Sequence, residues 1–241
     1  MRAALNLAGG LVWFVLQAIV ITRLLRGEWR RYPLIFVFVI SEFLVGVAQV
    51  PTNLSLSFHQ TAAAQSWSAT VYERGEVFLE FFTFVVVISL IFRATAHLQS
   101  RGPMRVICVA GAALFVGTSF WIHFNPRVGV GLWMTPWTRD LNFGTSILDL
   151  ALWSLLMTQR RKDSRLLLLS GALGIQFAGS AIAHSLRTLA TPHHIGWLSM
   201  MGGKLVVVSS LVRVYLWARA FRPAPLVTGK GLALDVPSEP G

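Results

Sequence analysis

One stretch decides the fold: VYERGEVFLEFFTFVVVISLIF, residues 71–92, in which three glutamates and an arginine precede a long apolar run. The run is long enough for an α-helix to cross a hydrocarbon layer about 30 Å thick. A charged side chain at membrane depth costs free energy and usually serves a function. The glutamates of this stretch are therefore the first candidates for a functional site.

Six further apolar blocks flank this stretch, in a chain that is 54% hydrophobic and only 13% charged. Such a chain has too little polar surface to cover a soluble domain. We expect an all-α, polytopic bundle of seven transmembrane helices, at about residues 6–22, 33–50, 71–92, 104–122, 140–158, 166–187 and 192–218. Together these form one membrane domain, residues 1–220.

The connections between the blocks follow from local signals. Pro51 is expected to end the second helix, and Thr191 and Pro192 to begin the seventh. Residues 52–70 are rich in serine, threonine and alanine and are expected to form a loop. Residues 221–241 contain four prolines and no sustained period, which predicts a disordered tail. The first block lacks a clear small-residue cleavage site, which favours a retained helix over a cleaved signal peptide.

The net charge of +11 indicates topology rather than nucleic-acid binding, because the basic residues lie in short runs between apolar blocks. Counted by alternate sides, fifteen lysines and arginines fall on one side and four on the other, with Arg213 among the fifteen. This asymmetry predicts an amino terminus outside and a carboxyl terminus in the cytoplasm. The single cysteine, Cys108, excludes an internal disulfide and a cysteine-cluster metal site.

Several expected helices carry polar residues on one face at 100° per residue. In the stretch at residues 71–92, Glu73, Glu76 and Glu80 form an acidic stripe that descends from the outer surface. On the seventh helix, Trp197, Met200 and Lys204 share a face with His193. Residues expected to bind a ligand or ion inside the bundle come from five helices: Glu42, Glu76, Glu80, Asn142, Asp149, Gln176 and Lys204.

Two interpretations of this polar group remain open. In the first, Lys204 pairs with Glu80 or Asp149, and the pair has the purely structural role of fixing how the helices pack. Alternatively, the group lines a cavity, since it contains more charges than packing requires. Facing these charges to lipid would cost about 2.5–3.5 kcal/mol for each aspartate or lysine at a helix centre. In either case we expect them to converge inside the bundle.

The histidines suggest a metal site, because five of the six map to the outer half of the helices. Imidazole and carboxylate groups are ligands that suit zinc. However, no HxxxH or HExxH pair presents two ligands from one helical face, and histidines at a membrane interface also bind lipid headgroups. The metal therefore stays unknown, with these residues as the weak candidates: Glu73, His123, His184, His193 and His194.

Lys204, midway along a seventh helix, resembles in outline the lysine that holds the chromophore in retinal proteins. That family carries an aspartate one turn before the lysine, where this chain has Met200. Its sixth helix usually brings aromatic residues and proline around the retinal ring, whereas the expected sixth helix here has only Phe177. Zinc-dependent seven-helix membrane hydrolases are another class, but they need an aspartate and paired histidines in the core.

The stretch at residues 71–92 also resembles a group of bacterial seven-helix membrane proteins to which no activity is assigned. Their third helix begins with an aromatic residue, continues with Gly-Glu and ends in Ile-Phe. Here these residues are Tyr72, Gly75, Glu76, Ile91 and Phe92. The resemblance covers most of the seven helices and implies a multi-pass protein of the bacterial inner membrane. Glu73, Arg74 and Glu80 lie outside the group's pattern.

These observations predict a polar intramembrane cavity that binds or conducts a small polar or cationic solute or protons. A receptor-like or accessory role is also consistent, acting through the bilayer and a membrane-protein partner or a homo-oligomer. No catalytic residue, cofactor or nucleic-acid partner is predicted, so the expectation leans away from an enzyme. A zinc-dependent hydrolase is the alternative, and a retinal-binding protein using Lys204 is a weaker one.

Overall fold

The computed structural model describes residues 2–58, 62–97, 101–126, 130–158, 163–193 and 196–222, although not every side chain within these ranges. These residues form seven α-helices and two short 3-10 turns: α1 (Arg2–Leu25), η1 (Glu28–Arg30), α2 (Pro33–Phe58), α3 (Ala62–Ala94), η2 (Thr95–His97), α4 (Arg101–His123), α5 (Val130–Thr158), α6 (Ser164–His193) and α7 (Gly196–Ala220). Each α-helix contains a stretch long and apolar enough to cross a membrane. The expected all-α fold with seven such helices is confirmed.

The structure differs from the sequence-based expectation between the second and third helices. α2 continues through Pro51 to Phe58, and α3 begins at Ala62, so most of the expected loop at residues 52–70 is helical. Proline inside a helix removes one backbone hydrogen bond and crowds the carbonyl of the preceding turn, but α2 stays helical on both sides of Pro51. The alanines at the start of α3 have the highest helix propensity of all residues. The serines and threonines therefore did not indicate a loop here.

Two other helix ends also differ from the expectation. α6 runs to His193, so Thr191 and Pro192 belong to its last turn and not to the beginning of α7. α5 begins at Val130, which places Trp133 and Trp137 on a helix. Their rings pack with Phe120 of α4 at centroid distances of 5.7 and 5.4 Å. Aromatic packing between helices extends α5 beyond its apolar block. The expected tail at residues 223–241 lies outside the described residues.

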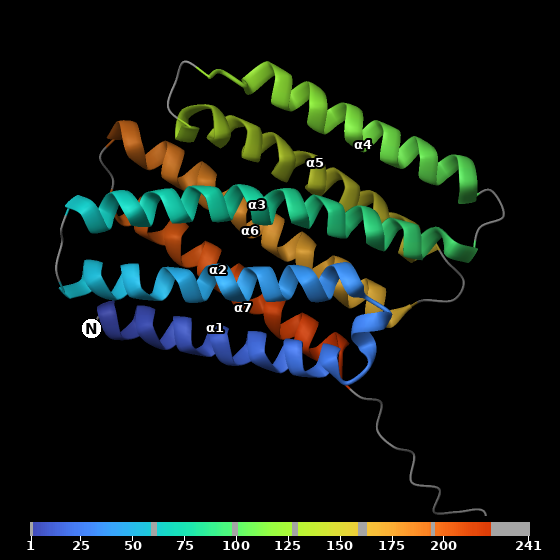
Figure 1. The fold of residues 1–241 in the computed structure, drawn as a ribbon, viewed down its shortest axis with the longest axis horizontal. Helices are drawn as coiled ribbons and strands as arrows, with labels where there is room; N and C mark the ends of the chain where they lie inside the picture. The colour runs from blue at the N-terminus through green and yellow to red at the C-terminus, as the bar shows by residue number, and fades with distance from the viewer. Residues whose placement is uncertain are drawn as a thin grey trace, which may run out of the picture.

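The helices lie side by side along the long axis of the molecule, with α1 and α4 on opposite edges (Figure 1). α6 and α7 form the most extensive contact between helices, and α4 packs mainly against α5. Gly179 of α6 allows the closest approach to α7, because a Cβ atom added there would lie 2.4 Å from Cβ of Ser209. This glycine brings the polar residues of α6 and α7 close together.

The apolar core lies toward the end of the bundle where α1, α3, α5 and α7 finish. Leu24, Phe38, Leu90, Leu156 and Trp217 are among its fully buried members. α4 contributes little, and three of its apolar side chains are more than 70% exposed: Ile107, Leu114 and Trp121. Exposed apolar area on this scale is typical of a surface that meets lipid or another protein.

We call this end of the bundle the basic end, because it carries Arg23, Arg93, Arg105, Arg165 and Arg219. Guanidinium groups there donate hydrogen bonds to backbone carbonyl groups of other segments. Arg23 binds the carbonyl oxygen of Ala218, and Arg105 binds that of Phe92 at 2.9 Å. Helix carbonyls without a partner are favourable sites for cations. These contacts connect α1 to α7 and α4 to α3.

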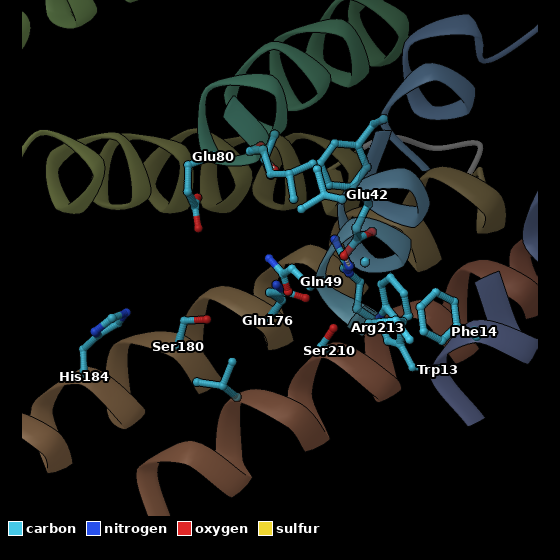
Figure 2. Close-up of a pocket in the computed structure, with 17 residues that line it drawn as sticks. Trp13, Phe14, Glu42, Gln49, Glu80, Gln176, Ser180, His184, Ser210 and Arg213 are labelled. Carbon is cyan, nitrogen blue, oxygen red and sulfur yellow. Dashed lines mark hydrogen bonds and ion pairs between the residues drawn. The ribbon is translucent and has the colours of Figure 1, made fainter. Parts of the chain in front are cut away.

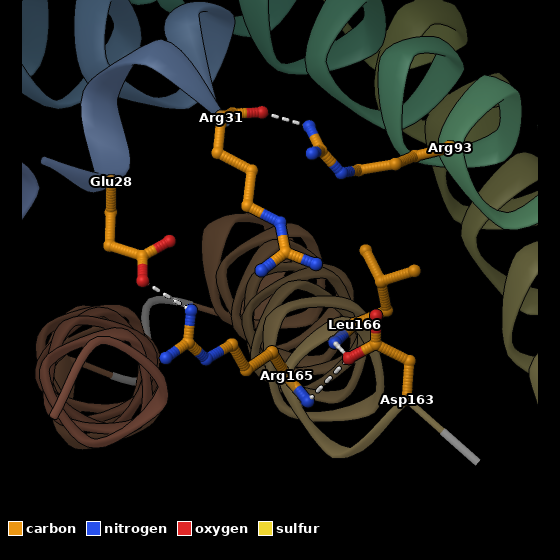
Figure 3. Close-up of polar contacts among 6 residues, drawn as sticks. All are labelled: Glu28, Arg31, Arg93, Asp163, Arg165 and Leu166. Atoms are coloured by element: carbon orange, nitrogen blue, oxygen red, sulfur yellow. Dashed lines mark hydrogen bonds and ion pairs between the residues drawn. The ribbon is translucent and has the colours of Figure 1, made fainter. Parts of the chain in front are cut away.

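A second set of contacts at the basic end joins the α1–α2 connection to α3 and α6 (Figure 3). Arg165 forms an ion pair with Glu28, and Arg93 donates a hydrogen bond to the carbonyl oxygen of Arg31. Asp163 caps α6 by accepting the backbone N–H groups of Arg165 and Leu166 at 3.0 and 3.2 Å.

Tyr32 lies next to these contacts, with the guanidinium of Arg93 4.1 Å from the centre of its ring. Burial raises the pKa of the Tyr32 phenol above its ordinary value, and the charge of Arg93 opposes that shift. The phenol therefore stays neutral at physiological pH. A neutral ring under a guanidinium adds a cation–π contact to the basic end.

Candidate functional site

A cavity of about 390 Å³ lies between five helices, α1, α2, α3, α6 and α7 (Figure 2). Aromatic side chains of α1 and α2 form one side of it, namely Trp13, Phe14 and Phe38. Its polar lining comes from four helices: Glu42, Gln49, Glu80, Thr83, Gln176, Ser180, His184, Ser210 and Arg213.

The floor of the cavity is a buried ion pair between Glu42 of α2 and Arg213 of α7. The Arg213 side chain is 2% exposed and donates a hydrogen bond to Oε1 of Glu42. The other carboxylate oxygen, Oε2, accepts a 2.8 Å hydrogen bond from the buried amide of Gln17 on α1. Three helices therefore meet at one carboxylate. A buried charge requires such a partner, because desolvation of an unpaired ion is very costly.

Two aromatic rings flank the Arg213 guanidinium. The centres of the Phe38 and Trp217 rings lie 5.5 and 5.2 Å from its central carbon. The indole N–H of Trp217 in turn donates to the carbonyl oxygen of Leu169 at 3.3 Å. Cation–π contacts of this kind strengthen when they are removed from water. The two rings and Glu42 together restrict the orientation of the guanidinium.

Glu42 and Arg213 meet because they lie at similar depths. Glu42 comes nine residues after the start of α2 at Pro33, and Arg213 comes seven residues before the end of α7 at Ala220. At 1.5 Å per residue both lie roughly 10–14 Å from the basic end. Sequence reasoning missed Arg213 because it was counted as a cytoplasmic topology residue. Its depth matches that of Glu42, but an arginine at this distance from a helix end can also reach the headgroups, so depth alone does not single it out.

The cavity opens away from the basic end. His184 of α6 lines it and is exposed, whereas Arg213 at the floor is buried. His184 comes 20 residues after the start of α6, which puts it roughly 30 Å from the basic end. Glu80 lies between these two depths, and its carboxylate points into the cavity (Figure 2). A solute entering at His184 would pass Glu80 before reaching Arg213.

A side pocket of about 20 Å³ extends the cavity toward α5. It shares Glu80, Gln176 and Arg213 with the main cavity and adds Asn142 of α5. A space of this size with polar walls suits one water molecule.

The structure brings together four of the residues singled out from the sequence. Glu42, Glu80 and Gln176 line the main cavity, and Asn142 lines the side pocket. Asp149 lies elsewhere, buried between α5 and α6, where it accepts a 2.8 Å hydrogen bond from Ser170. The side chain of Glu76 lies outside the described residues.

Lys204 is the main departure from the expected site. It is exposed and does not line the cavity. Nine residues separate it from Arg213, which at 100° per residue places the two on opposite faces of α7. Trp197 and Met200, expected on the inner face, are 61% and 39% exposed. Helical periodicity correctly grouped Trp197, Met200 and Lys204 on one face of α7. It could not show which face of the helix turns inward, because α7 carries polar residues on both faces.

This placement also bears on the retinal alternative. The opposite face of α7, with Gly202, Ser209, Arg213 and Trp217, is the buried one. Among the described side chains, the cavity wall contains no lysine that could bind retinal covalently.

The candidate metal ligands are dispersed. His123 of α4 pairs with Asp140 of α5 at 2.9 Å, and Ser119 donates to the same carboxylate oxygen at 2.9 Å. His184 lies at the mouth of the cavity. Within the described part of the chain, no group of three or more His, Cys, Asp or Glu residues is close enough to hold a metal ion. His194 and the side chains of Glu73 and His193 lie outside that part.

Comparison with known proteins finds no matching family model, no matching characterised protein and no matching solved structure. Function is therefore argued from the geometry of the cavity. The cavity offers a fixed guanidinium, one carboxylate midway along the wall, several hydroxyl and amide groups, and an aromatic side. These groups suit recognition of a small polar solute or transfer of protons.

Proposed function

We propose that the chain is a multi-pass membrane protein whose cavity binds or conducts a small polar or cationic solute or protons. The observation that carries this proposal is the cavity of about 390 Å³, with the Glu42–Arg213 ion pair at its floor and Glu80 on its wall. Small-molecule sites usually measure about 300–1,000 Å³.

Membrane insertion is supported by the distribution of apolar and basic residues. The exposed faces of the long helices are apolar, as on α4, and most of the arginines lie toward one end. The excess of basic residues on one side supports a cytoplasmic location for the basic end. The cavity then opens outward, toward the side that carries His184. The resemblance of residues 71–92 to bacterial seven-helix proteins supports the bacterial inner membrane as the location.

The polar lining supports a ligand site more than a packing role. Glu42, Arg213 and Gln17 suffice to fix α1, α2 and α7. Glu80, Ser180 and Ser210 line open space, where apolar residues would cost less free energy at membrane depth. The described chain contains no large soluble domain, so a receptor-like role would require a partner protein or a homo-oligomer.

Ligand binding can be tested by the thermal stability of the purified protein. A ligand that binds only the folded state raises the melting temperature as its concentration exceeds its Kd. The panel contains amino acids, monocarboxylates, alkylamines and alkali cations, with Ser180→Trp as a variant that fills the cavity. We expect at least one class to stabilise the wild type and not the variant.

Transport is distinguished from binding in liposomes that contain the protein and a pH-sensitive dye. Proton or solute flux that Glu80→Gln reduces would support conduction, whereas binding without flux would support a receptor-like or accessory role. If no solute stabilises the wild type selectively and no flux occurs, the proposed function is wrong.

A further inference from the structure

Arg213 retains most of its hydrogen-bonding capacity. A guanidinium has five N–H donors. In the described structure, its only hydrogen-bond partner is Glu42, and its Nε–H is buried without an acceptor. Arg213 lines both the cavity and the side pocket. A buried, charged donor group is therefore incompletely satisfied at the floor of a polar cavity, which is costly unless another acceptor binds there.

Glu42 does not supply the missing acceptors in this structure. One of its carboxylate oxygens accepts from Arg213, and the other accepts from Gln17 at 2.8 Å. The carboxylate is thus shared between two donors and does not form a two-pronged pair with the guanidinium. An arginine fork matches a carboxylate through two parallel hydrogen bonds. Arg213 has further N–H donors for such a pair, and the Phe38 and Trp217 rings flank its guanidinium.

We propose that the solute of this cavity carries a carboxylate group, which Arg213 binds at the cavity floor. The inference rests on the proposed function and specifies its ligand. Arg213 is already neutralised by Glu42, so a simple anion would bring an excess negative charge into a buried site. A solute that also carries an ammonium group avoids this cost, because it has no net charge. Its carbon skeleton would contact the aromatic side at Trp13 and Phe14.

Three probes with one carbon skeleton separate these contributions: butyrate, 2-aminobutyrate and butylamine. Their binding to the purified full-length protein is measured by isothermal titration calorimetry. We expect 2-aminobutyrate to bind most tightly, butyrate to bind more weakly, and butylamine to bind at least tenfold more weakly than 2-aminobutyrate.

The role of Arg213 is tested in the double variant Glu42→Gln/Arg213→Gln, which leaves no unpaired charge at the floor. It should reduce the affinity for both carboxylate probes at least tenfold. The matched control is Arg219→Gln, which alters an exposed arginine on the same helix and should leave all affinities unchanged. A second variant, Glu42→Gln alone, keeps the guanidinium and removes the charge that neutralises it, so it should bind butyrate more tightly than the wild type does.

Three outcomes overturn the inference: butylamine binds as tightly as the carboxylates, neither carboxylate probe binds, or the double variant binds both carboxylates as the wild type does. Butylamine binding that Ser180→Trp removes would leave the proposed function standing while the inference fails. The proposed function fails separately, when no member of the wider panel binds and no flux occurs.

Discussion

At the scale of single residues, the arrangement around Glu42 explains why charged groups can lie inside this bundle. One carboxylate receives a guanidinium from α7 and an amide from α1. The combination of helical periodicity and similar depth grouped Glu42, Glu80 and Gln176, because polar residues at membrane depth face inward. It could not identify Arg213, since an arginine seven residues from a helix end is equally compatible with reaching the headgroups.

Replacement of Glu42 or Arg213 by leucine should destabilise the fold. Each single change leaves its partner as an unpaired buried charge, which costs about 3–5 kcal/mol. The double variant should cost less than the sum of the two by about 1–3 kcal/mol. Equilibrium unfolding in detergent micelles measures this coupling. Additive effects would show that the two side chains do not stabilise the fold as a pair.

The pair Glu80→Gln and Lys204→Met is the matched control for that cycle. Lys204 is exposed on the face of α7 opposite Arg213, so the two changes should add within about 0.5 kcal/mol. A larger coupling would indicate that Lys204 does reach the cavity, as the sequence had suggested.

Ser170→Ala tests the separate polar contact between α5 and α6. The variant removes the hydrogen bond to buried Asp149 without changing the shape of the helix contact. We expect a loss of about 1–3 kcal/mol in the free energy of unfolding, because the carboxyl group stays buried without that donor. Ligand binding should be unchanged, since neither residue lines the cavity. Reduced binding would connect Asp149 to the site.

At the scale of helices, the sequence determined how many there are but not where they end or how they are rotated. Seven apolar blocks became seven helices because an α-helix satisfies its backbone hydrogen bonds within its own segment, and each block is long enough to span a membrane. The ends depended on alanine propensity and on aromatic contacts between α4 and α5, which composition does not reveal. The rotation of α7 was decided by its contact with α6, where glycine allows close approach.

Two glycines of α6 should respond oppositely to alanine. At Gly179 the new methyl group would lie 2.4 Å from Cβ of Ser209, so the helices must separate, at a cost of about 1–3 kcal/mol. At Gly171 nothing lies within 4 Å, and Gly171→Ala should gain up to about 1 kcal/mol from helix propensity. Thermal unfolding of the two variants compares them. Equal effects would contradict the close contact of α6 with α7.

At the scale of the whole molecule, the basic end and the mouth of the cavity lie at opposite ends of the bundle. The excess of basic residues that distinguishes one end of the bundle from the other was visible in the sequence. The cavity was not, because its volume depends on how five helices tilt and rotate together. The orientation in the membrane remains a prediction from charge.

Cysteine labelling tests that orientation. On a Cys108→Ser background, Arg26→Cys introduces a thiol near the basic end, and Asn125→Cys introduces one at the connection after α4. Both positions are exposed. In intact cells a membrane-impermeant maleimide should label the cysteine at 125 only, and inverted membrane vesicles should give the reverse. Labelling of position 26 from outside would invert the proposed topology.

The contacts of the basic end also have a mechanical consequence. Arginines tie the ends of α3 and α7 to neighbouring segments, and the Glu28–Arg165 pair ties the α1–α2 connection to α6. The helices are thus clamped at one end, whereas the mouth near His184 is roughly 30 Å away. A clamp at one end converts a small change of tilt into a large displacement at the other. We therefore expect the helix ends around the mouth of the cavity to move apart while the basic end stays closed. Amide hydrogen exchange should then be slowest at the basic end and fastest around the mouth.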